Sequence, residues 1–251
     1  MGFLINPYRF TVAGFDDTGL KAYWKFNEAS GDIINVSQSA VDLGSAADIQ
    51  ISGATYAQTG KIGNALSFDG INDVGVVGTS ASQFNFMHNT TALFSINFWV
   101  KRITLAQPPV IFTTTSGSTN NIGVWINFVA NNDIDFAIVR GVGGTYVITN
   151  AGNSLVNIAD TTTWHMVTYT YDQSLASLNL KTYLDGTAST TLNKTVNAPS
   201  NSNATRAANM FSDANFGFGA NYFDEMSIWN RILTQAEITS LYNSGAGLEI
   251  Y

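Results

Sequence analysis

Strict alternation of apolar and polar residues in several short segments is the feature that most limits what this chain can fold into. Such segments recur along the chain, separated by clusters of Gly, Asn, Ser and Asp. Their apolar rows are Phe94, Ile96, Phe98 and Val100 in 94–101; Ile122, Val124, Ile126 and Phe128 in 122–129; Ile134, Phe136 and Ile138 in 133–139; and Leu178, Leu180 and Leu184 in 178–184. A period of two indicates half-buried antiparallel strands. The sequence therefore predicts an all-β domain.

One helix is predicted near the C-terminus, over residues 234–243 (TQAEITSLYN). Thr234 followed three positions later by Glu237 forms a capping box, and Gly245 or Gly247 can end the helix. The apolar face of this helix consists of Ile238, Leu241 and Tyr242, which predicts packing against a sheet. Many short strands with one late helix indicate a two-sheet antiparallel jelly-roll β-sandwich with one short C-terminal helix.

The composition excludes several classes of partner. Charged residues make up 12 % of the chain, against roughly 25 % in an average globular protein, and the net charge is −7. We find no cluster of Lys and Arg, so we expect no nucleic-acid partner and no binding to anionic lipid. Cysteine is absent, which excludes disulfides and thiolate chemistry, and a zinc site built on the two histidines is not expected. No apolar run approaches the roughly 20 residues of a membrane-spanning helix.

The first ten residues, MGFLINPYRF, resemble neither an export signal nor a strand. A basic start is lacking, and Asn6-Pro7 interrupts the apolar run before it, so we expect no export by a standard signal. The sequence predicts an N-terminal docking arm over 1–19, followed by one domain over 20–251. The arm is expected to order on a neighbouring subunit or a particle surface. Its predicted apolar contacts are Phe3, Leu4, Ile5, Tyr8 and Phe10.

Six motifs occur in one order along most of the chain. They are LKAYWKFNEASGD (20–32), TGKIGNALSFDGIND (59–73), FSINFWVKR (94–102), WHMVTYTYD (164–172), YLDG (183–186) and FDEMSIWNRILTQAEITSLYNSG (223–245). This series resembles the laminin-G-like members of the concanavalin A-like lectin/glucanase superfamily over roughly residues 20–245. The resemblance implies two antiparallel sheets, one of them concave, with the first and last strands adjacent. It implies little about chemistry, because such sandwiches host binding and catalysis alike.

The resemblance also implies a structural calcium ion that bridges the first and last strands away from the concave face. Calcium takes about six to eight oxygen ligands. The candidate ligands are Glu28, Asp69 and Asp224, with Asn72, Asp73 and Glu225 in reserve. A purely structural alternative remains for Asp69 in FDGIND, where it can cap backbone amides of a turn that Gly70 relaxes.

Two further motif residues are expected to be structural. His165 matches a histidine that is common at this place in the family, and no second histidine or serine motif lies nearby in the sequence. Hydrogen bonding within the sandwich is its predicted role. Arg231 stands just before the predicted helix and is expected to tie a loop carboxylate.

Catalysis is not expected. Glucanases of the superfamily carry Glu, Asp and Glu at i, i+2 and i+5 of one strand, and none of the glutamates (Glu28, Glu225, Glu237 and Glu249) fits that pattern. Asp133 and Asp135 form a same-face acidic pair at the start of a predicted strand. Because the opposite row is apolar, these acids are expected to mark the solvent face.

Sugar binding is the more favoured chemistry. It uses aromatic faces against sugar rings, with amides and carboxylates for the hydroxyl groups. Trp99 and Trp125 lie opposite the apolar rows of their strands and are candidates for exposure, although loops often cover such rings in a sandwich. Tyr146 and Tyr222 stand next to Gly- or Asn-rich turns. These four residues are the candidate ligand-binding set.

Three functions are weighed on these grounds. The first is a non-catalytic virion structural or adhesion protein of a bacteriophage, located on the virion and extracellular after lysis. Its partners are expected to be other virion proteins or a second copy, through the arm, and a host-surface polysaccharide or glycan. The opening GFLINPYRF resembles the start of some phage structural proteins. The second is a bacterial carbohydrate-binding module, secreted or at the cell surface, and the third is an unusual glycoside hydrolase.

Overall fold

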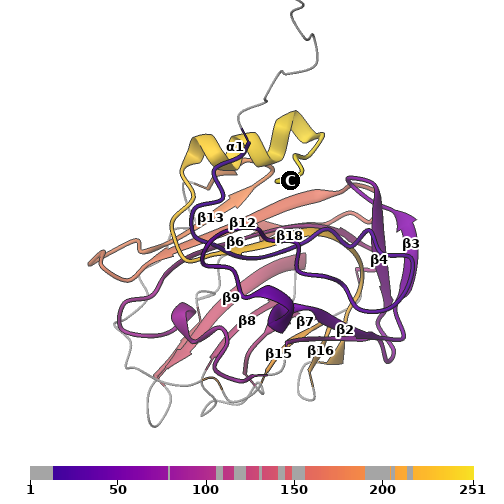
Figure 1. The fold of residues 1–251 in the computed structure, drawn as a ribbon, viewed down its shortest axis with the longest axis horizontal. Coiled ribbons are helices and arrows are strands. Elements are labelled where there is room, and N and C mark those ends of the chain that lie inside the picture. The colour runs from indigo at the N-terminus through magenta and orange to yellow at the C-terminus, as the bar shows by residue number, and fades with distance from the viewer. Residues whose placement is uncertain are drawn as a thin grey trace, which may run out of the picture.

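The computed structural model describes residues 14–78, 80–105, 110–115, 123–129, 132–140, 145–148, 156–189, 204, 207–213 and 217–251. It stacks three layers, with helix α1 (Gln235–Tyr242) over one sheet and that sheet over a second (Figure 1). The apolar contacts predicted for the arm, between residues 3 and 10, lie outside the described residues. The predicted all-β sandwich with one short C-terminal helix is confirmed.

The sheet beneath the helix, called sheet A, has eight antiparallel strands among the residues described. Its order is β14 (Thr187–Ala188), β13 (Leu180–Leu184), β12 (His165–Asp172), β6 (Leu93–Arg102), β18 (Ala220–Trp229), β4 (Asn64–Asp69) and β3 (Thr55–Thr59), with β1 (Leu20–Trp24) also on β18. The first half of β18 pairs with β4 and the second half with β1. The first and last strands are therefore adjacent, as the family resemblance implied.

The second sheet, sheet B, also has eight strands in the part of the chain that the structure describes. Its order is β10 (Thr145–Ile148), β9 (Asp133–Arg140), β8 (Gly123–Phe128), β7 (Val110–Thr113), β15 (Ala208–Met210), β5 (Val74–Val77) and β2 (Ile49–Ser52), with β11 (Val156–Asn157) on β9. A small ribbon of β16 (Ser212–Asp213) and β17 (Gly217–Phe218) lies beside it, and the 3₁₀ turns are η1 (Gly44–Ala47), η2 (Asn85–Met87) and η4 (Asn243–Gly245).

The core between the sheets is built from the predicted apolar rows. Phe94, Ile96, Phe98 and Val100 of β6 are fully buried, as are the described members of the rows in β8 and β9. The prediction fails at Leu178, which is 51 % exposed. Leu178 has φ of +50° in the loop before β13, so it leaves the strand geometry that would have pointed it inward.

Helix α1 covers the outer face of sheet A. Its predicted capping box is present, since the Thr234 hydroxyl accepts from the Glu237 amide and the Glu237 carboxylate accepts from the Thr234 amide. Ile238 and Leu241 are buried in a second cluster between helix and sheet. Asn243, with φ of +48°, ends the helix in place of the predicted Gly245 or Gly247. Its side chain bonds the Gly247 carbonyl, which is a local way to stabilise a left-handed residue.

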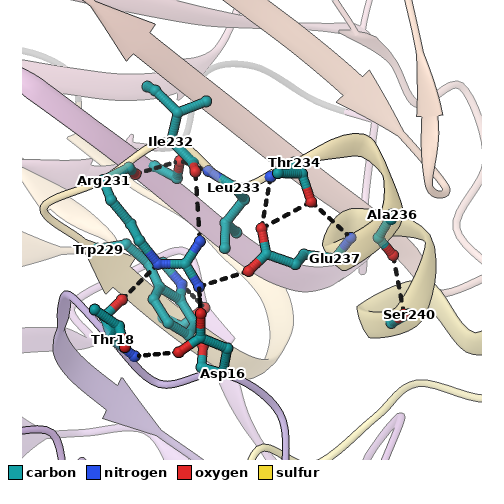
Figure 2. A network of polar contacts seen from close by, with 12 residues as sticks. Asp16, Thr18, Trp229, Arg231, Ile232, Leu233, Thr234, Ala236, Glu237 and Ser240 are labelled. Atoms are coloured by element: carbon teal, nitrogen blue, oxygen red, sulfur yellow. Dashed lines mark hydrogen bonds and ion pairs between the residues drawn. The ribbon is translucent and has the colours of Figure 1, made fainter.

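Residues 14–19, predicted as the end of the arm, contact the domain in this structure. The Phe15 ring lies 5.7 Å from the ring of Trp229 at the end of β18. The Arg231 guanidinium donates to the carbonyls of Asp16 and Thr18 and pairs with Glu237 at 2.7 Å (Figure 2). The predicted structural role of Arg231 is thus confirmed, and the same contact joins the N-terminal segment to the helix start.

Within the described parts of the chain, no helix has both the length and the hydropathy needed to cross a lipid bilayer.

Candidate functional site

The outer face of sheet A brings together aromatic and cationic side chains from three strands. In β6 the apolar row faces the core, so Ser95, Asn97, Trp99 and Lys101 point to the helix side. The register places Tyr222 of β18 directly opposite Lys101. Trp164 precedes β12, in which His165 pairs with Val100. Trp164, Lys101 and Tyr222 therefore form one row across three neighbouring strands.

Lys101 lies between the two rings of this row. Its ammonium nitrogen is 4.5 Å from the Tyr222 ring centroid and 5.5 Å from that of Trp164, and the two centroids are 6.4 Å apart. A cation this close to aromatic faces is attracted by the ring quadrupole. All three side chains are partly exposed. Solvent and a ligand can therefore reach them.

A second lysine stands one row away on the same face. The ammonium nitrogen of Lys61 lies 4.7 Å from the ring centroid of Trp99. Trp99 is the residue two positions before Lys101 in β6. Lys61 and Lys101 make no ion pair with any acid in the part of the chain that the structure describes. We name Lys61, Lys101, Trp164 and Tyr222 the lysine–aromatic surface.

Trp99 itself does not present its ring to solvent. It is 2 % exposed and stacks on Tyr242 of α1, with centroids 5.7 Å apart and planes inclined by 16°. The sequence placed Trp99 correctly on the face opposite the core row, but the expectation of exposure was wrong because the helix covers that part of the face. Its ring instead supports Lys61.

A bulge in β18 places two acids side by side next to this surface. Between Asp224 and Ser227 the register with β6 shifts, at the point where β18 changes partner from β4 to β1. Asp224 Oδ2 accepts from the amides of Lys61 and Ile62 at 2.7 and 3.0 Å. Glu225 accepts from the Tyr23 hydroxyl. Burial raises the pKa of Asp224 to about 8 and that of Glu225 to about 9.

Comparison with protein families settles the class of the domain. The sequence model of the concanavalin A-like lectin/glucanases superfamily matches residues 77–239, well over half of the chain. This chain belongs to that superfamily. No curated protein matches the sequence.

Solved structures share the fold of this superfamily member at low sequence identity. A Trypanosoma rangeli sialidase superposes with a TM-score of 0.62 and 12 % identity, over 92 % of this chain and 34 % of the sialidase chain. The binding domain of botulinum neurotoxin DC superposes with a TM-score of 0.59 and 14 % identity, over 90 % of this chain and 51 % of that one. The chain thus spans about a third of the sialidase and about half of the toxin chain.

Each candidate calcium ligand that the superfamily resemblance implied accepts at least one hydrogen bond from a backbone amide. Asp69 accepts from the amides of Ile71 and Asn72, as the structural reading of its turn predicted. Glu28 accepts from the amide of Ile34, and Asp224 bonds as described above. No group of three or more acidic, histidine or cysteine side chains suited to a metal ion occurs among the residues described. A calcium site at Glu28, Asp69 and Asp224 stays a prediction.

The outer face of sheet B carries Asp133 and Asp135, the acidic pair that the sequence predicted on the solvent face. Asn127 of β8 pairs with Asp135 of β9, and Asp133 accepts a hydrogen bond from the side-chain Nδ2 of Asn157 at 2.9 Å. Asp133 and Asp135 are 6 % and 4 % exposed, so the expectation that they mark a solvent face was wrong. Trp125, 2 % exposed on the same face, does not fulfil the expectation of exposure either. The period of two identified the face correctly, but it carries no information about what covers that face.

Three predicted residues remain, namely Tyr222, Tyr146 and His165. Tyr222 is part of the lysine–aromatic surface, as its prediction as a ligand contact requires. The Tyr146 backbone pairs with Val139, but its side chain lies outside the described residues, so its role stays a prediction. His165 bonds Asp185 at 2.8 Å and Asp160 at 2.9 Å, which confirms hydrogen bonding within the sandwich.

Sequence reasoning missed Lys101 and Trp164. Lys101 ends the outward row of β6, and Trp164 was considered only as the neighbour of His165. The available signal was the alternation of side chains along a strand, called parity here. Because Val167 and Tyr169 face the core, alternation places Trp164 on the opposite, outer face. What parity alone could not supply was the register that sets Trp164, Lys101 and Tyr222 in one row.

Proposed function

We propose that this chain is a non-catalytic, lectin-like module that binds a glycan, and that it serves on a virion as an adhesion or structural protein. The observation that carries the binding role is the pair of partly exposed rings, Trp164 and Tyr222, with Lys101 held between them. Aromatic faces supply apolar contact to sugar rings, and an ammonium group donates hydrogen bonds to their oxygens. Both are present on one face.

The structural neighbours support the choice of ligand to test. One structure of the Trypanosoma rangeli sialidase is a complex with sialic acid, and the botulinum neurotoxin DC binding domain is in complex with SialylT. Those ligands belong to those proteins, and the shared property is the fold. They make sialylated glycans a reasonable first panel for this module.

The non-catalytic part of the proposal rests on the acidic residues. In most glycoside hydrolases two carboxyl groups flank the bond that is cut. The same-strand acids Asp133 and Asp135 are buried, and Asp133 is engaged by Asn157. Asp224 and Glu225 are also buried, and Glu225 is engaged by the Tyr23 hydroxyl. Neither pair faces the lysine–aromatic surface with an open position for a substrate.

The binding role is tested by removing one ring. Trp164→Ala is expected to weaken binding to a responsive glycan at least about tenfold, because aromatic contacts dominate small interfaces. Binding is measured by isothermal titration calorimetry after a glycan array identifies the ligand. Phe86→Ala is the matched control, since the Phe86 ring also carries a lysine, Lys21, but lies outside the surface. Equal affinities for wild type and Trp164→Ala would contradict the proposal.

The virion role is supported by the geometry of β18. Its last residue, Trp229, contacts Phe15 of the N-terminal segment, whereas Tyr222 near its start belongs to the lysine–aromatic surface. Seven residues of strand correspond to about 23 Å. An arm docked on a particle at one end would leave the glycan surface facing away. The alternative is a bacterial extracellular carbohydrate-binding module. It would bind a glycan through the same surface but would not be part of a virion.

A further inference from the structure

The lysine–aromatic surface is a local exception in an acidic protein. The chain has 18 acidic and 11 basic residues. Lys61 and Lys101 nevertheless lie on one face with no ion-pair partner among the residues described, each held by aromatic rings. An unpaired cation on an acidic protein attracts anions locally while the rest of the surface repels polyanions.

Acids in the segments around this surface have hydrogen-bond partners of their own. Asp160 bonds His165, and Asp69 caps its own turn. Asp224 is fully buried, with one carboxylate oxygen bonded to the amides of Lys61 and Ile62. None of these acids forms an ion pair with Lys61 or Lys101.

Lys101 is also positioned before any ligand arrives. A free lysine side chain loses rotamer entropy when it is immobilised on binding. The position of the Lys101 ammonium group over the rings of Trp164 and Tyr222 already restricts this side chain. A charged group that is ordered in advance binds an anion at lower entropic cost.

We propose that the glycan bound at this surface is anionic, with its carboxylate or sulfate group bound by Lys101 and supported by Lys61. The sugar ring carrying that group contacts Trp164 and Tyr222. This inference rests on the proposed function, because it names the ligand class of the same surface. Carboxylated and sulfated sugars share the chemistry of a compact anion on a hydroxylated ring, which suits an ammonium donor.

The test compares matched sugars on the full-length protein. Sialyllactose, sulfated lactose and lactose are titrated by calorimetry into wild type and Lys101→Met, whose unbranched side chain keeps the ring contacts but loses the charge. At least one anionic sugar is expected to bind wild type about tenfold more tightly than lactose, and Lys101→Met is expected to remove that difference. Added salt is expected to weaken the binding of the anionic sugar and to leave the binding of lactose unchanged.

Lys181→Met is the control, since Lys181 is an exposed lysine on β13, outside the surface. It is expected to behave as wild type. Equal affinity for anionic sugars and lactose, lost in Trp164→Ala, would overturn the inference and leave glycan binding intact. Absence of binding to every glycan would overturn the proposed function as well. Tighter binding of a single-stranded oligonucleotide than of any sugar would also overturn the inference.

Discussion

At the residue scale, the acids of the β18 bulge are the most unusual feature of the molecule. The bulge puts Asp224 and Glu225 next to each other on the helix side of sheet A, and Glu225 has φ of +51°. Lys25, Tyr23 and Glu249 are the other titratable groups around Glu225, and Glu249 also acts on Asp224. Because both carboxyl groups are desolvated, the fold favours their protonated forms.

This arrangement predicts that the protein loses stability as the pH rises. The pKa of each acid is near 4 in the unfolded chain and rises to about 8 for Asp224 and about 9 for Glu225 in the fold. The stabilisation is thus fully present below about pH 4 and is lost as the pH rises through the folded pKa values. The pKa of His165, raised by its bond to Asp185, acts in the same direction. We expect the free energy of unfolding to fall by at least about 2 kcal/mol between about pH 6 and pH 9.

Asp224→Asn separates the contribution of the bulge from that of His165. The amide oxygen can still accept from Lys61 and Ile62, so the fold is retained and the pH slope in urea unfolding should become shallower. His165→Gln is the comparison, because it removes the other group with a raised pKa and should keep the part of the slope that comes from the bulge. An unchanged slope in Asp224→Asn would show that Asp224 does not contribute to the pH dependence of the free energy of unfolding.

At the scale of elements, the connection from β18 to α1 joins three parts of the chain. Arg231 contacts the Trp229 ring at 4.9 Å, the carbonyl of Asp16 and the carboxylate of Glu237 (Figure 2). Glu237 in turn completes the capping box with Thr234. The start of the helix, the end of β18 and the N-terminal segment are thereby held by one network. The helix then covers Trp99 and leaves the lysine–aromatic surface open beyond its end.

The cap is expected to contribute measurably to stability. Thr234→Ala removes the hydroxyl that accepts from the Glu237 amide and should cost about 1 kcal/mol. In a chain of this size that corresponds to a melting temperature lower by about 2–4 °C. Ser240→Ala, in the same helix, removes only a hydroxyl that bonds back to the Ala236 carbonyl, and should change stability by less than about 0.5 kcal/mol. Equal melting temperatures for the two variants would contradict the capping argument.

At the scale of the whole molecule, the described N-terminal segment and the lysine–aromatic surface lie at opposite ends of β18. A chain lacking residues 1–13 keeps Phe15 and Asp16, and hence the contacts with Trp229 and Arg231. We expect it to melt at the same temperature as the full chain and to bind the same glycan. We expect it to lose self-association or incorporation into particles, measured by light scattering and by mass spectrometry of purified virions. A full-length chain that is monomeric under all conditions and absent from particles would contradict the virion role.

The elements were more predictable than the site. The rows of β6, β8 and β9 and the capping box of α1 are local patterns, and local patterns specify period and ends. Leu178 shows the limit, since one left-handed residue removed it from its row. For the site, parity placed Trp99 and Trp125 on the correct faces, whereas their burial depends on segments distant in sequence. Lys101 and Trp164 join Tyr222 through strand register, which no local pattern contains.

The sequence by itself determined the sandwich, the helix with its cap and the superfamily, because alternation and capping are properties of neighbouring residues. Only the tertiary structure decided which outward residues are exposed. Helix α1 covers Trp99, Asp224 and Glu225 are buried at the bulge, and the pairing of β12, β6 and β18 assembles Trp164, Lys101 and Tyr222. The physical reason is that a strand's period states which way a side chain points, whereas exposure depends on what packs over that side chain.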